Sequence, residues 1–245
     1  MAKTKIEWTE ETWNPITGCT PITHGCENCY ARIMAKRLKT MNSPRYENGF
    51  VVTIHNDLFN KPLTMKKPKM IFVCSMSDLF HEDVTFEVIE QLFDVMEKAY
   101  WHIFQVLTKR SKRLFKYLRM HNIPDNVWVG VSVENNFTIS RINDLSASRA
   151  TTKFISFEPL LEKVELDASV VSLETIDWVI VGGESGANAR PIEADWVIEI
   201  KDKCKKLDIP FFFKQWGGVN KKANGCLLNG KEYKEYPKSR CDNDE

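Results

Sequence analysis

Short runs rich in β-branched and aromatic residues recur from residue 69 onward, separated by longer segments whose apolar residues follow helical spacing. Six of these runs predict strands, at 70–75, 102–107, 127–133, 153–157, 177–182 and 210–214. The intervening segments predict helices at 85–99, 111–120, 136–146 and 194–207. Strands and helices that alternate in this way form βαβ units, so the pattern predicts a parallel sheet covered by helices.

Two further strand candidates lie at 8–15 and 50–55. With the six predicted strands they approach the eight strands of a parallel (β/α) barrel. We therefore expect one α/β domain built as a partial or full parallel (β/α) barrel, with a flat doubly wound sheet as the alternative. The 245 residues, 43% of them hydrophobic, are enough for one such core. Residues 1–218 are expected to form the barrel, and 219–245 a C-terminal hairpin and tail.

Three cysteines lie close together in the segment 18–31, GCTPITHGCENCYA, directly before a predicted helix at 30–40. Cys19, Cys26 and Cys29 can converge on one metal centre because the glycines and the proline between them let the loop fold back. Structural zinc and most iron–sulfur clusters take four protein ligands, so three thiolates would leave one coordination position open.

Three interpretations of this loop remain open from the residues alone. The first is a [4Fe–4S] cluster with one iron free for a ligand that is not protein. The second is zinc, with the fourth ligand supplied by His24 or a distant cysteine. The third is that the thiols serve only in packing, as expected for the scattered cysteines elsewhere in the chain.

Polar residues follow nearly every predicted strand. In a parallel barrel the carboxyl ends of the strands form one face, and that face carries the active site. The candidates are Ser75, Ser77, Asp78, Thr108, Lys109, Arg110, Ser132, Glu134, Asn135, Ser156, Glu158, Gly183, Glu184, Ser185, Lys214 and Gln215. The basic segment 108–122 would favour an anionic substrate, such as a nucleotide or nucleic acid, if it bordered this face; otherwise it is a solvated outer surface.

The net charge and the cysteine content indicate the kind of partner and the cellular compartment. The formal net charge is +1, so any anionic partner must be bound by a local patch. The seven cysteines are an odd number, and the start of the chain is charged, without the pattern of a signal peptide. We expect a cytoplasmic protein, and no run is apolar over the length that a membrane-spanning helix needs.

The segment TWNPITGCTPITHGCENCYARIMAKRL resembles the cluster region of radical SAM enzymes, especially the spore photoproduct lyase-like group. The whole chain is more similar to an uncharacterised family of phage and bacterial proteins with a three-cysteine motif. The matching pieces are WNPITGC, CENCYA, SMSDLFH, LTKR, VWVGVSVEN, FISFEPLL, WVIVGGESG and PFFFKQWGG. The first cysteine gap is longer than the usual CxxxCxxC. Asn28 stands where the resemblance implies an aromatic residue that packs on adenine, so either Tyr30 takes that role or the adenine is held differently.

The resemblance implies an enzyme in which Cys19, Cys26 and Cys29 bind a [4Fe–4S] cluster and S-adenosylmethionine fills the open iron. Such an enzyme takes an electron from a cellular donor, cleaves S-adenosylmethionine and starts radical chemistry on its substrate, here with a nucleotide or nucleic acid as the candidate. The residues expected to bind the cofactor or substrate are Tyr30, Ser75, Ser77, Asp78, Lys109, Ser132, Glu134, Glu158 and Glu184. The alternative is a non-catalytic nucleic-acid adaptor stabilised by zinc or a cluster.

Overall fold

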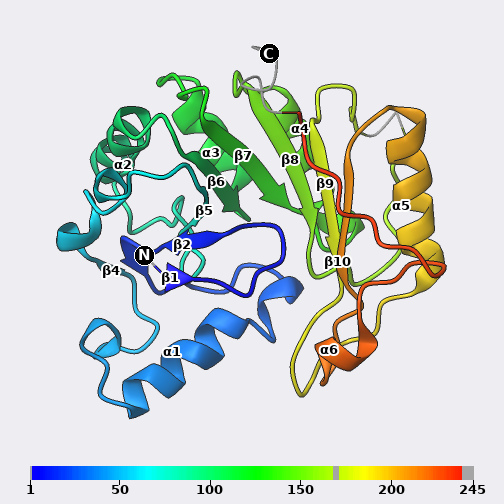
Figure 1. Cartoon of the computed structure of the whole chain (residues 1–245), viewed down its shortest axis with the longest axis horizontal. Helices are drawn as coiled ribbons and strands as arrows, with labels where there is room; N and C mark the ends of the chain where they lie inside the picture. The colour runs from blue at the N-terminus through cyan, green and yellow to red at the C-terminus, as the bar shows by residue number, and fades with distance from the viewer. Residues whose placement is uncertain (1, 168–170, 239–245) are drawn as a thin grey trace.

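The computed structural model describes residues 2–167 and 171–238. One eight-stranded sheet, in the order β1-β2-β5-β6-β7-β8-β9-β10, forms its centre. Strands β2 and β5 to β10 are parallel to their neighbours, and β1 is antiparallel to β2. The sheet curls without closing (Figure 1), so the predicted barrel is confirmed in its partial form.

The strands of the curled sheet have the following bounds: β1 (Ala2–Lys3), β2 (Glu11–Trp13), β5 (Met70–Val73), β6 (Ile103–Thr108), β7 (Val127–Ser132), β8 (Thr152–Phe157), β9 (Trp178–Gly182) and β10 (Phe211–Gln215). The helices are α1 (Tyr30–Thr40), α2 (Phe86–Lys98), α3 (Ser111–Leu118), α4 (Arg141–Ser146), α5 (Ala194–Lys206) and α6 (Lys221–Asn224). Short 3-10 turns occur at η1 (His24–Cys26), η2 (Pro44–Tyr46), η3 (Asn56–Leu58), η4 (Pro62–Thr64) and η5 (Asn136–Thr138).

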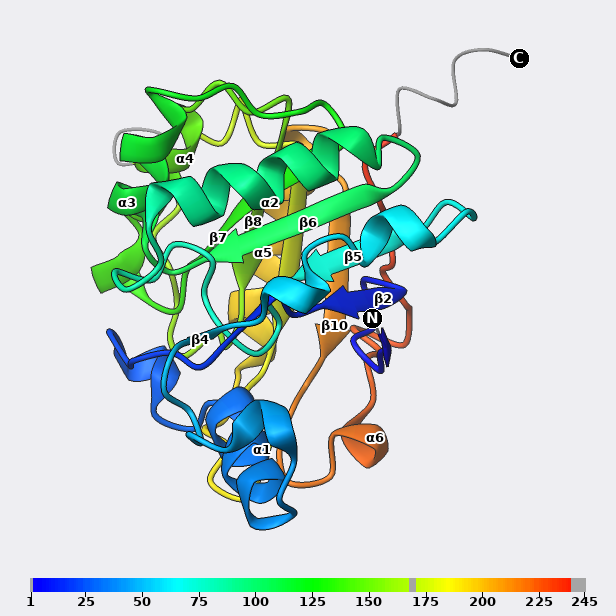
Figure 2. The same ribbon diagram turned by 90° about the vertical axis from the view of Figure 1, so that its left-hand side faces the viewer.

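The outer face of the sheet packs against α2, α3, α4 and α5 in one large hydrophobic core. Helix α2 shows why these segments are helical: its apolar residues recur at helical spacing, and the Thr85 hydroxyl accepts a hydrogen bond from the Val88 amide at its start. Figure 1 shows α2 and α5 at opposite ends of the curled sheet, and Figure 2 shows α1 apart from α2, α3 and α4 at one end of the molecule.

The inner face carries a separate layer, the aromatic floor, made of Trp8, Phe72, Trp128, Phe154, Trp178, Ile180 and Phe212. Trp8 comes from the segment before β2 and closes the layer, with its ring centroid 4.7 Å from that of Phe72. Gly130 on β7 makes room for the floor, because a Cβ there would lie 2.5 Å from the Phe154 ring. Burial of each of these side chains contributes roughly 1.5–3 kcal/mol to stability.

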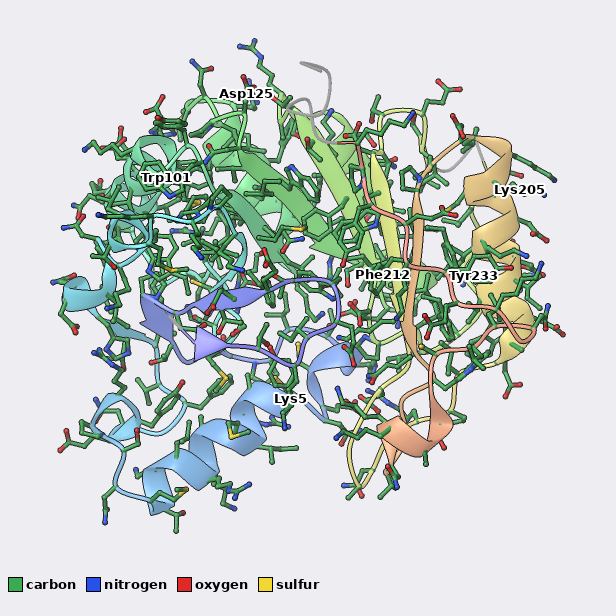
Figure 3. All side chains as sticks on the ribbon, viewed as in Figure 1. Lys5, Trp101, Asp125, Lys205, Phe212 and Tyr233 are labelled. Carbon is green, nitrogen blue, oxygen red and sulfur yellow. The ribbon has the colours of Figure 1, made fainter. Side chains whose placement is uncertain are left out.

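The run of phenylalanines on β10 divides between the two faces. Of the three phenylalanines Phe211, Phe212 and Phe213, only Phe212 joins the aromatic floor. Phe211 and Phe213 point to the opposite face, where Phe211 packs with Tyr233. Figure 3 labels Phe212 and Tyr233 among the side chains of this part of the molecule. The two-residue period of a strand explains the difference, since adjacent side chains point to opposite faces.

Two sequence predictions needed correction. The strand expected at 50–55 is not part of the barrel: β4 (Thr53–Ile54) pairs with β3 (Ile16–Thr17) in a separate two-stranded sheet. The helix expected over 136–146 is divided into η5 and α4, because Asn135 and Thr138 form a capping box at the first turn. The helices predicted at 30–40, 85–99, 111–120 and 194–207 are present within two residues of their expected ends.

The segment after β10 returns to the edge of the sheet. It contains α6, a bridge between Leu228 and Lys231, and an antiparallel bridge from Lys234 to Phe212 on β10. The last part of the predicted tail, 239–245, lies outside the described residues.

Candidate functional site

A cavity of about 240 Å³ lies at the carboxyl ends of the strands. The aromatic floor contributes Trp8 and Phe72 to its lining, and the cysteine loop, which we define as residues 18–31, forms another part of its wall. The predicted candidates that line it are Cys19, Cys26, Cys29, Tyr30, Ser75, Ser77, Asp78, Lys109, Ser132, Glu158 and Glu184. Two strand-end candidates, Glu134 and Asn135, do not line the cavity.

The cysteine loop is fastened at its start to the end of β5. The Gly18 amide donates to the Met76 carbonyl at 2.9 Å, and the Ser77 hydroxyl donates to the Gly18 carbonyl at 2.6 Å. Gly18 has φ +87°, and a Cβ at this position would lie 2.2 Å from the carbonyl oxygen of Val51, so only glycine fits. Ser77, a candidate cofactor residue, therefore also holds the loop that carries the thiols.

Arg110, which follows β6, forms a hydrogen bond with Cys19. Its guanidinium lies 3.2 Å from Asp78, 2.8 Å from Glu82 and 3.0 Å from the Thr20 carbonyl, and it donates to the Cys19 sulfur at 3.5 Å. Burial, followed by the nearby Asp78 carboxylate, raises the pKa of the Cys19 thiol to about 11, although Arg110 acts in the opposite direction.

Asp78 has few free positions for a ligand. Besides Arg110, its carboxylate accepts hydrogen bonds from the Thr108 hydroxyl at 2.7 Å, from the Lys109 amide at 3.1 Å and from the Phe80 amide at 3.0 Å. These contacts make Asp78 a junction between the ends of β5 and β6, on the wall of the cavity.

Glu134, from the end of β7, is fully buried beneath the cysteine loop. Its carboxylate lies 3.2 Å from Lys109 and 2.9 Å from Arg141, and it accepts a hydrogen bond from the Thr23 hydroxyl at 2.9 Å. Burial opposes ionisation, but Lys109 and Arg141 outweigh it and hold the pKa of Glu134 below its ordinary value. Gly25 rests directly on this side chain, since a Cβ there would lie 2.5 Å from the Glu134 Cγ.

Glu184 and Arg190 hold the other end of the loop. The Arg190 guanidinium lies 2.6 Å from Glu184 and 3.1 Å from Glu27, and it donates to the His24 carbonyl at 2.9 Å. The Asn28 amide donates to Glu184 at 2.9 Å. Asn28 thus fixes the loop to the end of β9.

The strand-end turn after β9 is built for close approach to the turn after β10. A Cβ on Gly183 would lie 2.1 Å from the Trp216 carbonyl oxygen, and the Gly218 amide donates to the Glu184 carbonyl at 2.7 Å. Gly183 therefore allows the two turns to pack closely beside Glu184.

Glu158 and Lys214 also line the cavity and form an ion pair with each other. Lys214 lies 2.8 Å from one Glu158 oxygen, and the other oxygen accepts from the Ser156 hydroxyl at 3.0 Å and from the Trp8 indole at 3.2 Å. Lys109 donates to the Glu158 backbone carbonyl at 3.4 Å and lies 3.2 Å from the Glu134 carboxylate, so it connects the turn after β8 with the end of β7. Paired charges that still border a cavity can be redirected toward a bound ligand.

Sequence reasoning placed Gln215 at a strand end but gave it no role. Its side chain is buried and lines the cavity, yet Oε1 has no hydrogen-bond partner among the described residues. A buried acceptor without a partner costs stability, and a ligand with an N–H or O–H group in the cavity would satisfy it.

Cys74 is a second residue without a predicted role that lines the same cavity. Its thiol is buried, and burial raises its pKa above the usual range of a cysteine.

His24, the predicted fourth zinc ligand, is not part of the lining: its side chain is 78% exposed and its Nδ1 lies 2.7 Å from Glu27. Within 2–167 and 171–238, no three His, Cys, Asp or Glu side chains are gathered closely enough to hold a metal ion.

The basic segment on α3 forms an outer surface. Lys112 and Lys116 are exposed, Arg113 stacks over the Phe86 ring at 4.6 Å, and none of them lines the cavity. Only Lys109 and Arg110, before the first turn of α3, reach the cavity.

A family model matches residues 3–237, which is nearly the whole chain. The chain belongs to the DUF5131 family. This family is described as proteins of unknown function, and no curated protein matches the chain. No helix among the residues that the structure describes is both long and apolar enough to cross a membrane.

Among solved structures, this DUF5131 protein is similar to spore photoproduct lyase complexed with dinucleoside spore photoproduct, at 11% identity and a TM-score of 0.43. That match covers 84% of this chain and 63% of the lyase chain. A mutant of the same lyase matches at 11% identity and a TM-score of 0.42, over 74% of this chain and 57% of the lyase chain. The assignment of the fold rests on the strand order and register described above.

Proposed function

We propose that this DUF5131 protein is a radical SAM-type enzyme that binds a [4Fe–4S] cluster through Cys19, Cys26 and Cys29, with S-adenosylmethionine on the open iron. The observation that carries the proposal is that the three thiols and the polar strand ends line one cavity. When bound, the cluster supplies the electron that cleaves S-adenosylmethionine. A cytoplasmic location suits this chemistry, since it keeps thiols reduced.

The donor set suits a cluster better than a single zinc ion. Each cysteine of a cubane cluster binds a different iron atom, so the thiols surround the space that the cluster fills. The four ligands of a tetrahedral zinc ion all bind the same atom and therefore lie closer together. The three thiols border a cavity without converging, and His24 faces solvent. Cys74 is the one remaining thiol of the lining that could complete a four-ligand site.

The predicted cofactor residues would divide into two groups. Ser77, Asp78, Glu134 and Glu184 are engaged with the cysteine loop or with its supports, and we assign them to holding the thiols in position. Tyr30, Ser75, Lys109, Ser132 and Glu158 would bind the cofactor and the substrate. Lys109 offers a cation for a carboxylate, and Glu158 offers oxygens for an amine or for ribose hydroxyls.

The substrate would occupy the part of the cavity near β10. Lys214 can pair with an anionic group, and Gln215 lacks a hydrogen-bond donor for its buried oxygen. A nucleotide or a segment of nucleic acid has both an anionic group and ring N–H donors, and its base could contact the aromatic floor. The competing function is a non-catalytic adaptor whose metal site is structural.

Metal analysis of the protein purified without oxygen tests the proposal. We expect iron and sulfide in the ratio of a [4Fe–4S] cluster in the wild type, loss of both in Cys26→Ala, and retention in His24→Ala, Cys74→Ala and the remote control Cys204→Ala. One zinc per chain in place of iron would contradict the proposal. Loss of metal in Cys74→Ala would instead indicate a four-ligand, structural site.

A further inference from the structure

Helix α1 is packed with its small residues inward and its large apolar residues outward. Ala31 and Ala35 are buried against Met76, whereas Ile33 and Met34 are 60% and 42% exposed. Tyr30 and Met41 are also more than half exposed. A helix stabilised only by its own core normally shows the opposite arrangement.

The exposed residues of α1 form a continuous surface. Tyr30, Ile33, Met34, Arg37 and Met41 are spaced three or four residues apart, so they lie side by side along one side of the helix. We call these five residues the outer face of α1. Grouped apolar side chains on a surface indicate a binding site for another molecule, whereas single ones do not.

The helix that carries this surface is positively charged, with Arg37 in the outer face and Lys36 beside Ile33. Helix α1 contains Arg32, Lys36, Arg37 and Lys39 and no acidic residue. Lys36, Arg37 and Lys39 are exposed, and none of them forms an ion pair with any residue in the described part of the chain. The outer face of α1 is therefore complementary to an acidic surface that also has apolar groups.

The outer face of α1 is also directly connected to the thiols. The helix begins at Tyr30, the residue after Cys29, and Tyr30 both lines the cavity and is 51% exposed. Helices α2, α3 and α5 lie over the outside of the sheet, whereas α1 stands at the end that carries the cysteine loop (Figure 2). A partner on this face would be adjacent to the cysteine loop without covering the sheet.

We propose that an acidic one-electron carrier protein docks on the outer face of α1. The proposal rests on the proposed function, which requires the oxidised cluster to receive one electron from a reduced donor. In this step the carrier is oxidised by one electron, the cluster is reduced by one electron, and no covalent bond forms or breaks. The apolar centre with a charged border is typical of a protein interface, whereas nucleic-acid interfaces are more polar throughout. Electron-transfer encounters need only a small surface of this kind.

Stopped-flow reduction of the iron-loaded protein tests this docking site. A purified acidic flavodoxin, reduced beforehand, is mixed with the wild type, with Lys36→Glu/Arg37→Glu and with Ile33→Ser/Met34→Ser, and the loss of cluster absorbance is followed. We expect both variants to be reduced about tenfold or more slowly by flavodoxin, and the wild-type rate to fall as salt increases. Dithionite, which needs no docking surface, should reduce all proteins at equal rates. Lys205→Glu/Lys206→Glu on α5 is the matched control and should react as the wild type does.

The outcomes separate the two proposals. Equal flavodoxin rates in all iron-loaded variants would overturn the docking site and leave the proposed function standing. Equal rates combined with weaker binding of the α1 variants to a duplex oligonucleotide or to anionic lipid vesicles would assign the surface to that partner instead. A chain that carries no iron cluster before any carrier is added would overturn the proposed function, and with it the docking site.

Discussion

Gly25 of the cysteine loop rests on Glu134, which is buried between Lys109 and Arg141. A methyl group at position 25 would lie 2.5 Å from the Glu134 Cγ and 2.6 Å from its Oε1, closer than non-bonded atoms approach. The position of Cys26 therefore depends on the absence of a side chain next to it. This relationship leads to the first prediction.

Gly25→Ala should displace the loop and reduce the iron bound per chain, and overpacking should lower the free energy of unfolding by about 1–3 kcal/mol. Iron analysis and urea unfolding measure the two effects. Gly130→Ala is the control, because its Cβ would meet the Phe154 ring at 2.5 Å in the aromatic floor. It should lose similar stability and keep its iron. Full iron loading in Gly25→Ala would contradict the role assigned to this contact.

Glu134→Gln should remove a buried charge that two cations neutralise, so we expect a loss of about 3–5 kcal/mol of stability at neutral pH. The pKa of Glu134 is lowered in the folded protein, so its stabilising effect is present above the unfolded pKa of a glutamate and is lost as the pH falls through the lower folded value. Urea unfolding between neutral pH and about pH 3 should show a smaller acid dependence in Glu134→Gln than in the wild type. Equal acid dependence would show that other carboxylates are responsible.

Arg190→Met should free the end of the cysteine loop, because Arg190 bonds to Glu184, Glu27 and the His24 carbonyl. Hydrogen exchange measured by mass spectrometry should show faster exchange at 24–28 and no change in β6 or β7. Unchanged exchange across the loop would mean that Glu134 and Asn28 alone fix it.

Gln215→Leu should stabilise the protein by about 1 kcal/mol in the absence of ligand, since it removes a buried acceptor that has no partner. Urea unfolding of the protein without ligand measures this effect. Gln105→Leu is the comparison: its Oε1 is also unpartnered, but its amide donates to the Trp8 carbonyl at 3.2 Å, so this variant should not gain stability. A loss of stability in Gln215→Leu would contradict a site reserved for a ligand.

The parallel barrel was predictable because its strands and helices have clear and different periods. Strand ends also located the cavity, since the ends of parallel strands meet on one face. The short pair β3 and β4 was missed as a separate sheet, because residues 50–55 alone do not show which strand they pair with. The split of the phenylalanine run required the register of β10, which only the sheet supplies.

The candidate site was predictable in its residue types and less so in their roles. Asp78, Glu134 and Glu184 are predicted to bind the cofactor or substrate, and in the structure each contacts an arginine. Arg190 gave no signal in the sequence, because its partners come from segments more than a hundred residues away as well as from nearby. Cys74 was passed over as a scattered thiol, since its position in the cavity depends on the turn after β5.

Formation of 5′-deoxyadenosine tests the central claim most directly. The iron-loaded protein is incubated without oxygen with dithionite and S-adenosylmethionine, and the nucleoside is measured by chromatography. We expect 5′-deoxyadenosine to form with the wild type and with Cys204→Ala, and none to form with Cys26→Ala. A wild-type protein that carries a reducible iron–sulfur cluster and forms no 5′-deoxyadenosine would contradict it.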